Sequence, residues 1–135
     1  MANITITAAN VIAGSVGDVY VAGEVIIPGQ WVYVKAADGR AWLSDNTTAA
    51  KAAAVGISLN RASAAGQPVC VLRSGVVAIG SVLTDKGNQY AISGTAGVMM
   101  DVADLAAGKF VTTVGYSESA TELSVVTMAT GLAYS

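Results

Sequence analysis

Two stretches of this chain resemble each other, and this repetition limits the folds open to it. Residues 54–78 read AVGISLNRASAAGQPVCVLRSGVVA, and residues 113–134 read TVGYSESATELSVVTMATGLAY. The matching segments are 55–58 with 114–117, 69–72 with 123–126, and 74–78 with 130–134. Each stretch alternates apolar and polar residues around a loop of small residues, which is typical of two joined β-strands. The sequence therefore predicts a duplicated β-hairpin.

The internal similarity extends beyond the hairpins and predicts how the whole chain is organised. Residues 87–92 resemble 29–34, and residues 96–98 stand where 38–40 stand in the first copy. An offset of roughly fifty residues is compatible with internal duplication. We predict one domain over residues 1–135, with an arm and loop at 1–17 and repeat halves at 18–84 and 85–135.

Turn signals between short strands set the predicted fold class. Pro28-Gly29 and Asp38-Gly39 are turn pairs, and the second predicts a hairpin between strands at 30–36 and 40–44. Only residues 48–53 and 101–108 offer one or two very short helices. We therefore predict an all-β, mainly antiparallel fold, either a small barrel or a sandwich.

Composition narrows the possible partners. Charged residues make up 12% of the chain, the formal net charge is −2, and no basic patch occurs, so we expect no nucleic-acid partner. No apolar run approaches the length of a membrane span, and the N-terminus lacks the pattern of a signal peptide, so we expect no membrane partner. A surface this poor in charge fits either a small, poorly soluble domain or one covered by partner subunits.

The residues that usually carry catalysis are scarce. The chain has no histidine, which removes the serine triad and histidine-containing zinc sites. Cys70, the single cysteine, lies in an alternating strand with nothing nearby in sequence to lower its pKa. Asp101 and Asp104 are too few for a calcium loop and suit turns or caps instead. We expect no enzyme activity, no metal and no cofactor.

The aromatic residues are the clearest candidates for binding. Alternation places Trp31, Tyr33 and Lys35 on one face of a strand, and Arg40 and Trp42 on one face of the next. Tryptophans are often core residues, but these share their faces with charged side chains. They are therefore either core residues or interface anchors. A platform for sugar binding would use the same side chains, so the pattern does not separate a protein partner from a ligand.

Several segments together resemble the capsid decoration, or cement, proteins of tailed bacteriophages. The similar segments are GQWVYV followed by DGR at 29–40, KAAAVGIS at 51–58, AGQPV at 65–69, SGVV at 74–77 and VADLAAGKFVT at 102–112. The similarity covers residues 29–131, and residues 1–27 fit the pattern least.

The resemblance implies a structural protein on the outside of the expanded phage head. Its expected partners are the major capsid protein and further copies of itself, as a homotrimer at capsomer junctions that stabilises the capsid. It would be made in the bacterial cytoplasm and located on the virion. The alternative is a phage-associated β-module that binds carbohydrate or a receptor, such as an adhesin.

An extended arm supplies a physical means of attachment, because a strand can add to the sheet edge of another protein through main-chain hydrogen bonds. The predicted interface combines this arm with the aromatic face. Its residues are Ala2, Asn3, Ile4, Thr5, Ile6, Thr7, Trp31, Tyr33 and Trp42.

Overall fold

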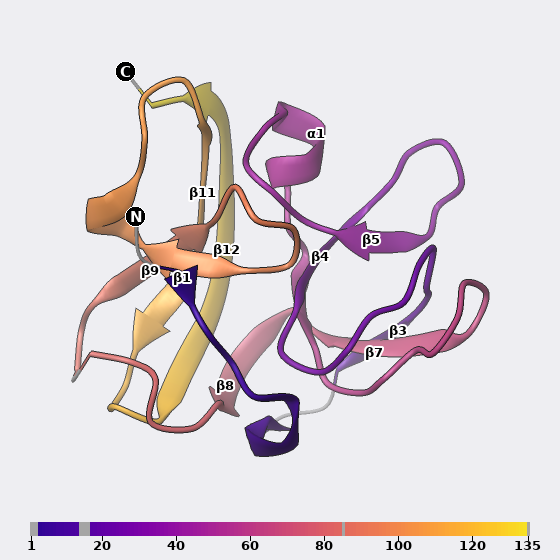
Figure 1. Ribbon diagram of the computed structural model, residues 1–135, viewed down its shortest axis with the longest axis horizontal. Helices are drawn as coiled ribbons and strands as arrows, with labels where there is room; N and C mark the ends of the chain where they lie inside the picture. Colours follow the sequence, from indigo (N-terminus) through magenta and orange to yellow (C-terminus); the bar gives the residue numbers. More distant parts are fainter. Residues whose placement is uncertain (1–2, 14–16, 85, 135) are drawn as a thin grey trace.

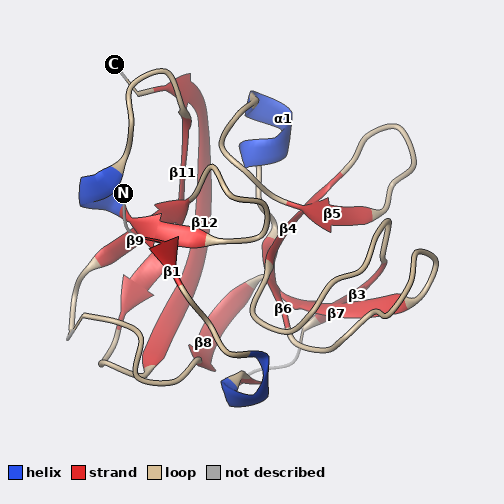
Figure 2. Ribbon diagram, in the orientation of Figure 1, coloured by secondary structure: helices blue, strands red, loops and turns tan. Residues whose placement is uncertain are grey.

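The computed structural model describes residues 3–13, 17–84 and 86–134, and its fold consists of two antiparallel sheets. The strands are β1 (Asn3–Ile4), β2 (Ile12–Ala13), β3 (Asp18–Val21), β4 (Trp31–Val34), β5 (Ala41–Leu43), β6 (Gly56–Ser58), β7 (Pro68–Leu72), β8 (Ser74–Ala78), β9 (Gln89–Ile92), β10 (Met99–Asp101), β11 (Phe110–Ser117) and β12 (Glu122–Ala133). Within the described residues, helical structure is limited to α1 (Ala49–Ala52) and the 3₁₀ turns η1 (Ala8–Asn10) and η2 (Val102–Asp104) (Figure 2). The predicted all-β, mainly antiparallel class is confirmed, in a sandwich-like form.

The two sheets have separate places in the molecule. The seven-stranded sheet A has the order β1-β10-β9-β11-β12-β8-β2, and the five-stranded sheet B has the order β3-β7-β6-β4-β5. Figure 1 shows most of sheet A on the left, sheet B on the right, and α1 at the top between them. The chain passes from one sheet to the other at Arg73, between β7 and β8.

The strand order contains the same topology twice. Sheet B orders its strands β3-β7-β6-β4-β5, and the central part of sheet A repeats this as β8-β12-β11-β9-β10. Because β8 is the counterpart of β3, the second unit begins near Ser74, and the boundary that we placed between residues 84 and 85 is about ten residues too late. The predicted match of 74–78 with 130–134 is also wrong, because the first segment is β8 and the second is the end of β12. These short segments share small residues and glycine, which recur in many β-strands.

Two glycines occupy equivalent places in the two units. A Cβ added to Gly56 in β6 would lie 2.2 Å from the carbonyl oxygen of Leu72, and one added to Gly115 in β11 would lie 2.1 Å from that of Ser124. Both neighbours belong to the strand that follows in the hairpin, so both hairpins need a bare backbone at this point. Gly56 and Gly115 therefore match in the two repeat units because each hairpin requires a residue without a side chain at this position.

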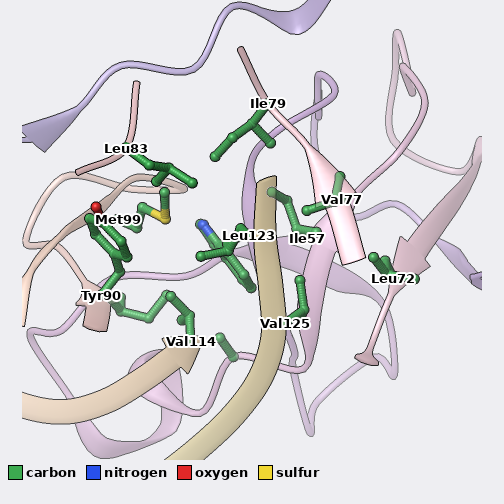
Figure 3. Packing of buried hydrophobic residues seen from close by; sticks show 13 residues of the cluster. Ile57, Leu72, Val77, Ile79, Leu83, Tyr90, Met99, Val114, Leu123 and Val125 are labelled. Atoms are coloured by element: carbon green, nitrogen blue, oxygen red, sulfur yellow. The ribbon is translucent and has the colours of Figure 1, made fainter. Parts of the chain in front are cut away.

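The main core lies between the sheets. Val77, Leu123 and Val125 of sheet A surround Ile57 of sheet B (Figure 3). A second, smaller core covers the other face of sheet B, where Val32, Val69 and Val71 pack against Ala22, Ile26, Ala41 and Ala62. The centre of sheet B, at β4 and β6, is therefore buried on both faces, which the alternating sequence pattern did not predict.

Local signals explain the connections between the strands. Gly39 has φ +67° in the predicted β4–β5 hairpin, where the backbone N–H of Arg40 donates to the carboxylate of Asp38. Thr48 caps α1 by accepting a hydrogen bond from the N–H of Lys51 at 3.2 Å. At η2 the cap is Asp101, one of the two carboxylates expected in turns or caps, and Asp104 is the last residue of the turn.

Buried Asn46 joins the connection before α1 to sheet A. Its N–H and side-chain amide donate to the carbonyls of Ser93 and Ile92, and its own carbonyl accepts from the N–H of Phe110. Through its backbone and its side chain, this single residue therefore fixes the loop of one repeat unit against two strands of the other.

Candidate interaction surfaces

The N-terminal arm is part of the fold. Asn3 and Ile4 form β1, the edge strand of sheet A, opposite Met100 and Met99 of β10. The Asn3 side chain donates to Thr95 Oγ1 at 3.1 Å and accepts from the hydroxyl of Ser93. Within the described residues no strand pairs with the outer side of β1. The arm is thus anchored on one side, and its other main-chain edge is available to a partner.

Side chains alternate along the arm in the way that an edge strand requires. Ile4 and Ile6 are partly buried and pack against the main core, whereas Asn3, Thr5 and Thr7 are exposed. A hollow of about 200 Å³ lies beside the arm, lined also by residues 27–30 and 97–99. Of the predicted arm residues, Ala2 lies outside the described part of the chain.

Two of the three predicted aromatic anchors are core residues. Trp31 is 0% exposed and belongs to the main core, and Tyr33 is 6% exposed. Of the two possibilities, core residues or interface anchors, these two are core residues and form no exposed face with Lys35, because β4 is buried on both sides from Trp31 to Tyr33. Burial also raises the pKa of Tyr33, and the charges of nearby Asp45, Glu24 and Asp38 add to this effect.

Trp42 is partly exposed but already occupied by contacts within the chain. The Lys35 ammonium lies 4.3 Å from its ring centroid, and its indole N–H donates to the Asp38 carboxylate at 3.2 Å. On the other side the ring presses on the backbone, since a Cβ at Gly23 would lie 2.2 Å from it. Trp42 therefore braces the β4–β5 hairpin. It does not join the arm or the other aromatic residues in one continuous surface.

The structure exposes an apolar surface that the sequence did not reveal. Ten large apolar side chains are exposed in the described part of the chain: Ile12, Val19, Val21, Val25, Val34, Tyr116, Val126, Met128, Leu132 and Tyr134. We call Val19 and Val21 the β3 patch, and Val126, Met128, Leu132 and Tyr134 the β12 patch. A sequence signal for the β12 patch existed, because residues 123–134 contain no charged residue and no proline.

Groups capable of covalent or metal chemistry are not gathered together. In residues 3–13, 17–84 and 86–134, no cluster of three histidine, cysteine or carboxylate side chains is placed to hold a metal ion. Cys70 is a half-buried thiol on β7, next to the N-terminal end of β3. The ion pair between Arg73 and Asp18 is solvent-exposed at 3.9 Å, and such pairs contribute little to stability.

Comparison of the chain with protein-family models, curated proteins and solved structures finds no match. No helix in the described ranges is long and apolar enough to cross a membrane. The geometry of the surfaces is therefore the basis for the functional proposal below.

Proposed function

We propose that this protein is a structural virion protein that binds the outer surface of an expanded phage head, as a trimer, and stabilises the capsid. The proposal combines the sequence resemblance to decoration proteins with the surface just described. On this proposal the protein is not an enzyme and needs no cofactor. Its partners are the major capsid protein and other copies of itself.

The observation that carries the proposal is the exposed apolar surface. Leu132 is 70% exposed and Met128 is 63% exposed, on a chain with only 12% charged residues. Apolar side chains exposed to this extent are a liability for a free monomer, and they are expected in a protein whose surface is covered after assembly. A capsid lattice would cover such a surface without requiring catalytic groups.

The arm supplies the proposed contact with the capsid protein. Its outer edge presents main-chain donors and acceptors, and its exposed side chains at Asn3, Thr5 and Thr7 are small and polar. A strand of the capsid protein can pair with this edge and extend sheet A beyond β1. Three arms on one trimer would act together, so each contact can be weak while the trimer stays bound.

The alternative, a carbohydrate-binding module, needs an exposed aromatic platform. Trp31 and Tyr33 are buried, and the Trp42 ring is covered by Lys35. No observation on the described residues favours this alternative.

The test is to mix the purified protein with expanded heads that lack it and to image the heads by electron microscopy. We expect ordered density at capsomer junctions. Absence of binding by the native protein would refute the proposal.

The arm contact is tested by a single substitution with a matched control. Proline at position 5 removes one main-chain donor and blocks further strand pairing, whereas alanine removes only the side chain. We expect Thr5→Pro and deletion of residues 1–7 to abolish head binding, and Thr5→Ala to retain it. Circular dichroism checks that the sheets remain folded. Equal head occupancy by Thr5→Pro and Thr5→Ala would show that the arm is not the attachment strand.

A further inference from the structure

The far end of β12 is an edge strand without a cover. β12 pairs with β8 only as far as Val126, which lies opposite Ser74. From Thr127 to Ala133, the one ladder partner of β12 among the described residues is β11. The helix α1 packs near this part of β11 and β12, yet residues 128–134 remain exposed. The hairpin therefore has an open main-chain edge that is interrupted near Gly131, which has φ +69° and where the N–H of Leu132 donates to Thr130 Oγ1 at 3.1 Å.

A second open edge, β3, carries two exposed apolar side chains, whereas the open edge strand β2 of sheet A carries exposed Ile12. The four residues of β3 pair with β7, and no strand in the described ranges pairs with their opposite side. Val19 is 71% exposed and Val21 is 45% exposed. Natural proteins usually protect such edges with charged residues, proline or bulges. On β3 the only charged residue is Asp18, at its start, beside Arg73.

Within one chain, the β12 edge and the β3 edge cannot form main-chain hydrogen bonds with each other. They belong to different sheets and lie on different sides of the molecule, with β3 at the right and the end of β12 at the top left of Figure 1. Six of the ten exposed large apolar side chains belong to the β3 patch or the β12 patch. Pairing β12 with its own symmetry copy would cover the β12 patch but leave the β3 patch in water.

We propose that copies of this protein join head to tail, with residues 127–133 of β12 in one copy adding as a strand to β3 of the next. A second copy fits both edges, because each chain supplies one of each and because uncharged residues 123–134 meet β3 without repulsion between like charges. Contacts between two different patches form a closed ring when the rotation between copies closes. The inference deepens the proposed function: the ring is the form that the proposed trimer takes.

The test uses two variants that each damage one edge. Val19→Lys places a charge on the β3 edge, and Met128→Lys places one on the β12 edge. Val25→Lys is the matched control, because Val25 is 52% exposed but lies outside both patches. The native protein and the Val25→Lys variant should form a ring in size-exclusion chromatography with light scattering. Each edge variant alone should have the mass of one chain.

Mixing the two edge variants in equal amounts gives the decisive measurement. The Val19→Lys copy keeps an intact β12 edge and the Met128→Lys copy keeps an intact β3 edge, so one contact remains possible. We expect a species with the mass of two chains, which also shows that both variants are folded. Absence of such a species would overturn the head-to-tail contact. Loss of assembly in Met128→Lys while Val19→Lys still assembles would also overturn it, in favour of twofold pairing of β12.

The same variants distinguish a failure of this inference from a failure of the proposed function. The mass measurements contain no heads, so they test only the contact between copies. A native protein that is a single chain in solution, with head binding lost in Met128→Lys, would overturn the inference by assigning the β12 edge to the capsid protein. A ring that does not bind heads would leave the inference intact and refute the proposed function.

Discussion

Replacing Trp31 by alanine should be among the most damaging changes in the protein, although its neighbours in the sequence resemble a surface strand. The side chain is 0% exposed in the core between the two sheets. A buried tryptophan removes roughly 200 Å² from water, and at about 25 cal/mol per Å² this corresponds to about 5 kcal/mol. The indole N–H of Trp31 has no hydrogen-bond partner among the described residues, and its removal offsets part of that loss, by about 1–3 kcal/mol. We expect a net cost of about 2–4 kcal/mol, which overlaps the usual range of about 3–5 kcal/mol for such substitutions.

Trp42→Ala is the matched control, because it removes the same atoms from a partly exposed site. The loss there is the contact with Lys35, about 0.5–1 kcal/mol, and an exposed hydrogen bond to Asp38 that water can replace. The difference between the two variants should thus be at least about 1 kcal/mol, with Trp31→Ala the less stable. The prediction is this difference in unfolding free energy between the two variants.

The assay is urea-induced unfolding followed by circular dichroism at one fixed protein concentration, because association between copies adds to apparent stability. A domain of this size is expected to have about 7–20 kcal/mol of stability, so Trp31→Ala should still fold. Quenching by acrylamide gives a second readout: Trp31 alone, in Trp42→Phe, should be protected, and Trp42 alone, in Trp31→Phe, should be accessible. Equal costs for the two alanine variants, or equal quenching, would refute the placement of Trp31.

Two further predictions concern the backbone and the pH dependence of stability. Gly56→Ala should cost about 3 kcal/mol or more in urea unfolding, because the new Cβ would lie 2.2 Å from the carbonyl oxygen of Leu72. Gly94→Ala, whose Cβ would meet only a side-chain oxygen at 3.3 Å, is the control, and equal costs would contradict the close approach. The backbone N–H of Arg40 is the largest of the contacts that lower the pKa of Asp38 below its ordinary value, so this carboxylate stabilises the fold above its ordinary pKa, and the contribution is lost as the pH falls through the lowered one. Asp38→Asn should therefore weaken the decline in melting temperature on acidification, and an unchanged acid profile would rule out this role.

Local patterns predicted much of the architecture. The Asp38-Gly39 pair marks a real hairpin because glycine adopts the positive φ that the turn requires. The similarity between residues 55–58 and 114–117 identified a true duplication, because Gly56 and Gly115 face the same backbone constraint. The boundary between the units was misplaced because β7 and β8 are contiguous in sequence but lie in different sheets.

The aromatic face shows where local patterns were insufficient. Alternation correctly put Trp31 and Val32 on opposite sides of β4. It could not reveal that loops around Ala22, Ile26 and Ala62 cover the second side, since the pattern within one strand does not show which loops fold over it. Because both sides of β4 are buried, the charged residues near it in the sequence did not indicate which of its side chains are exposed.

The sequence by itself determined the strand-and-turn character, the duplication and the scarcity of charge, because each depends on residues that are close in the chain or on composition alone. The tertiary structure decided which edges are paired and which are open. It anchored the arm on β10, extended β12 beyond β8 and left β3 at the rim of sheet B. Pairing between strands depends on contacts across the whole chain, and so the surfaces proposed for assembly became visible only in the folded molecule.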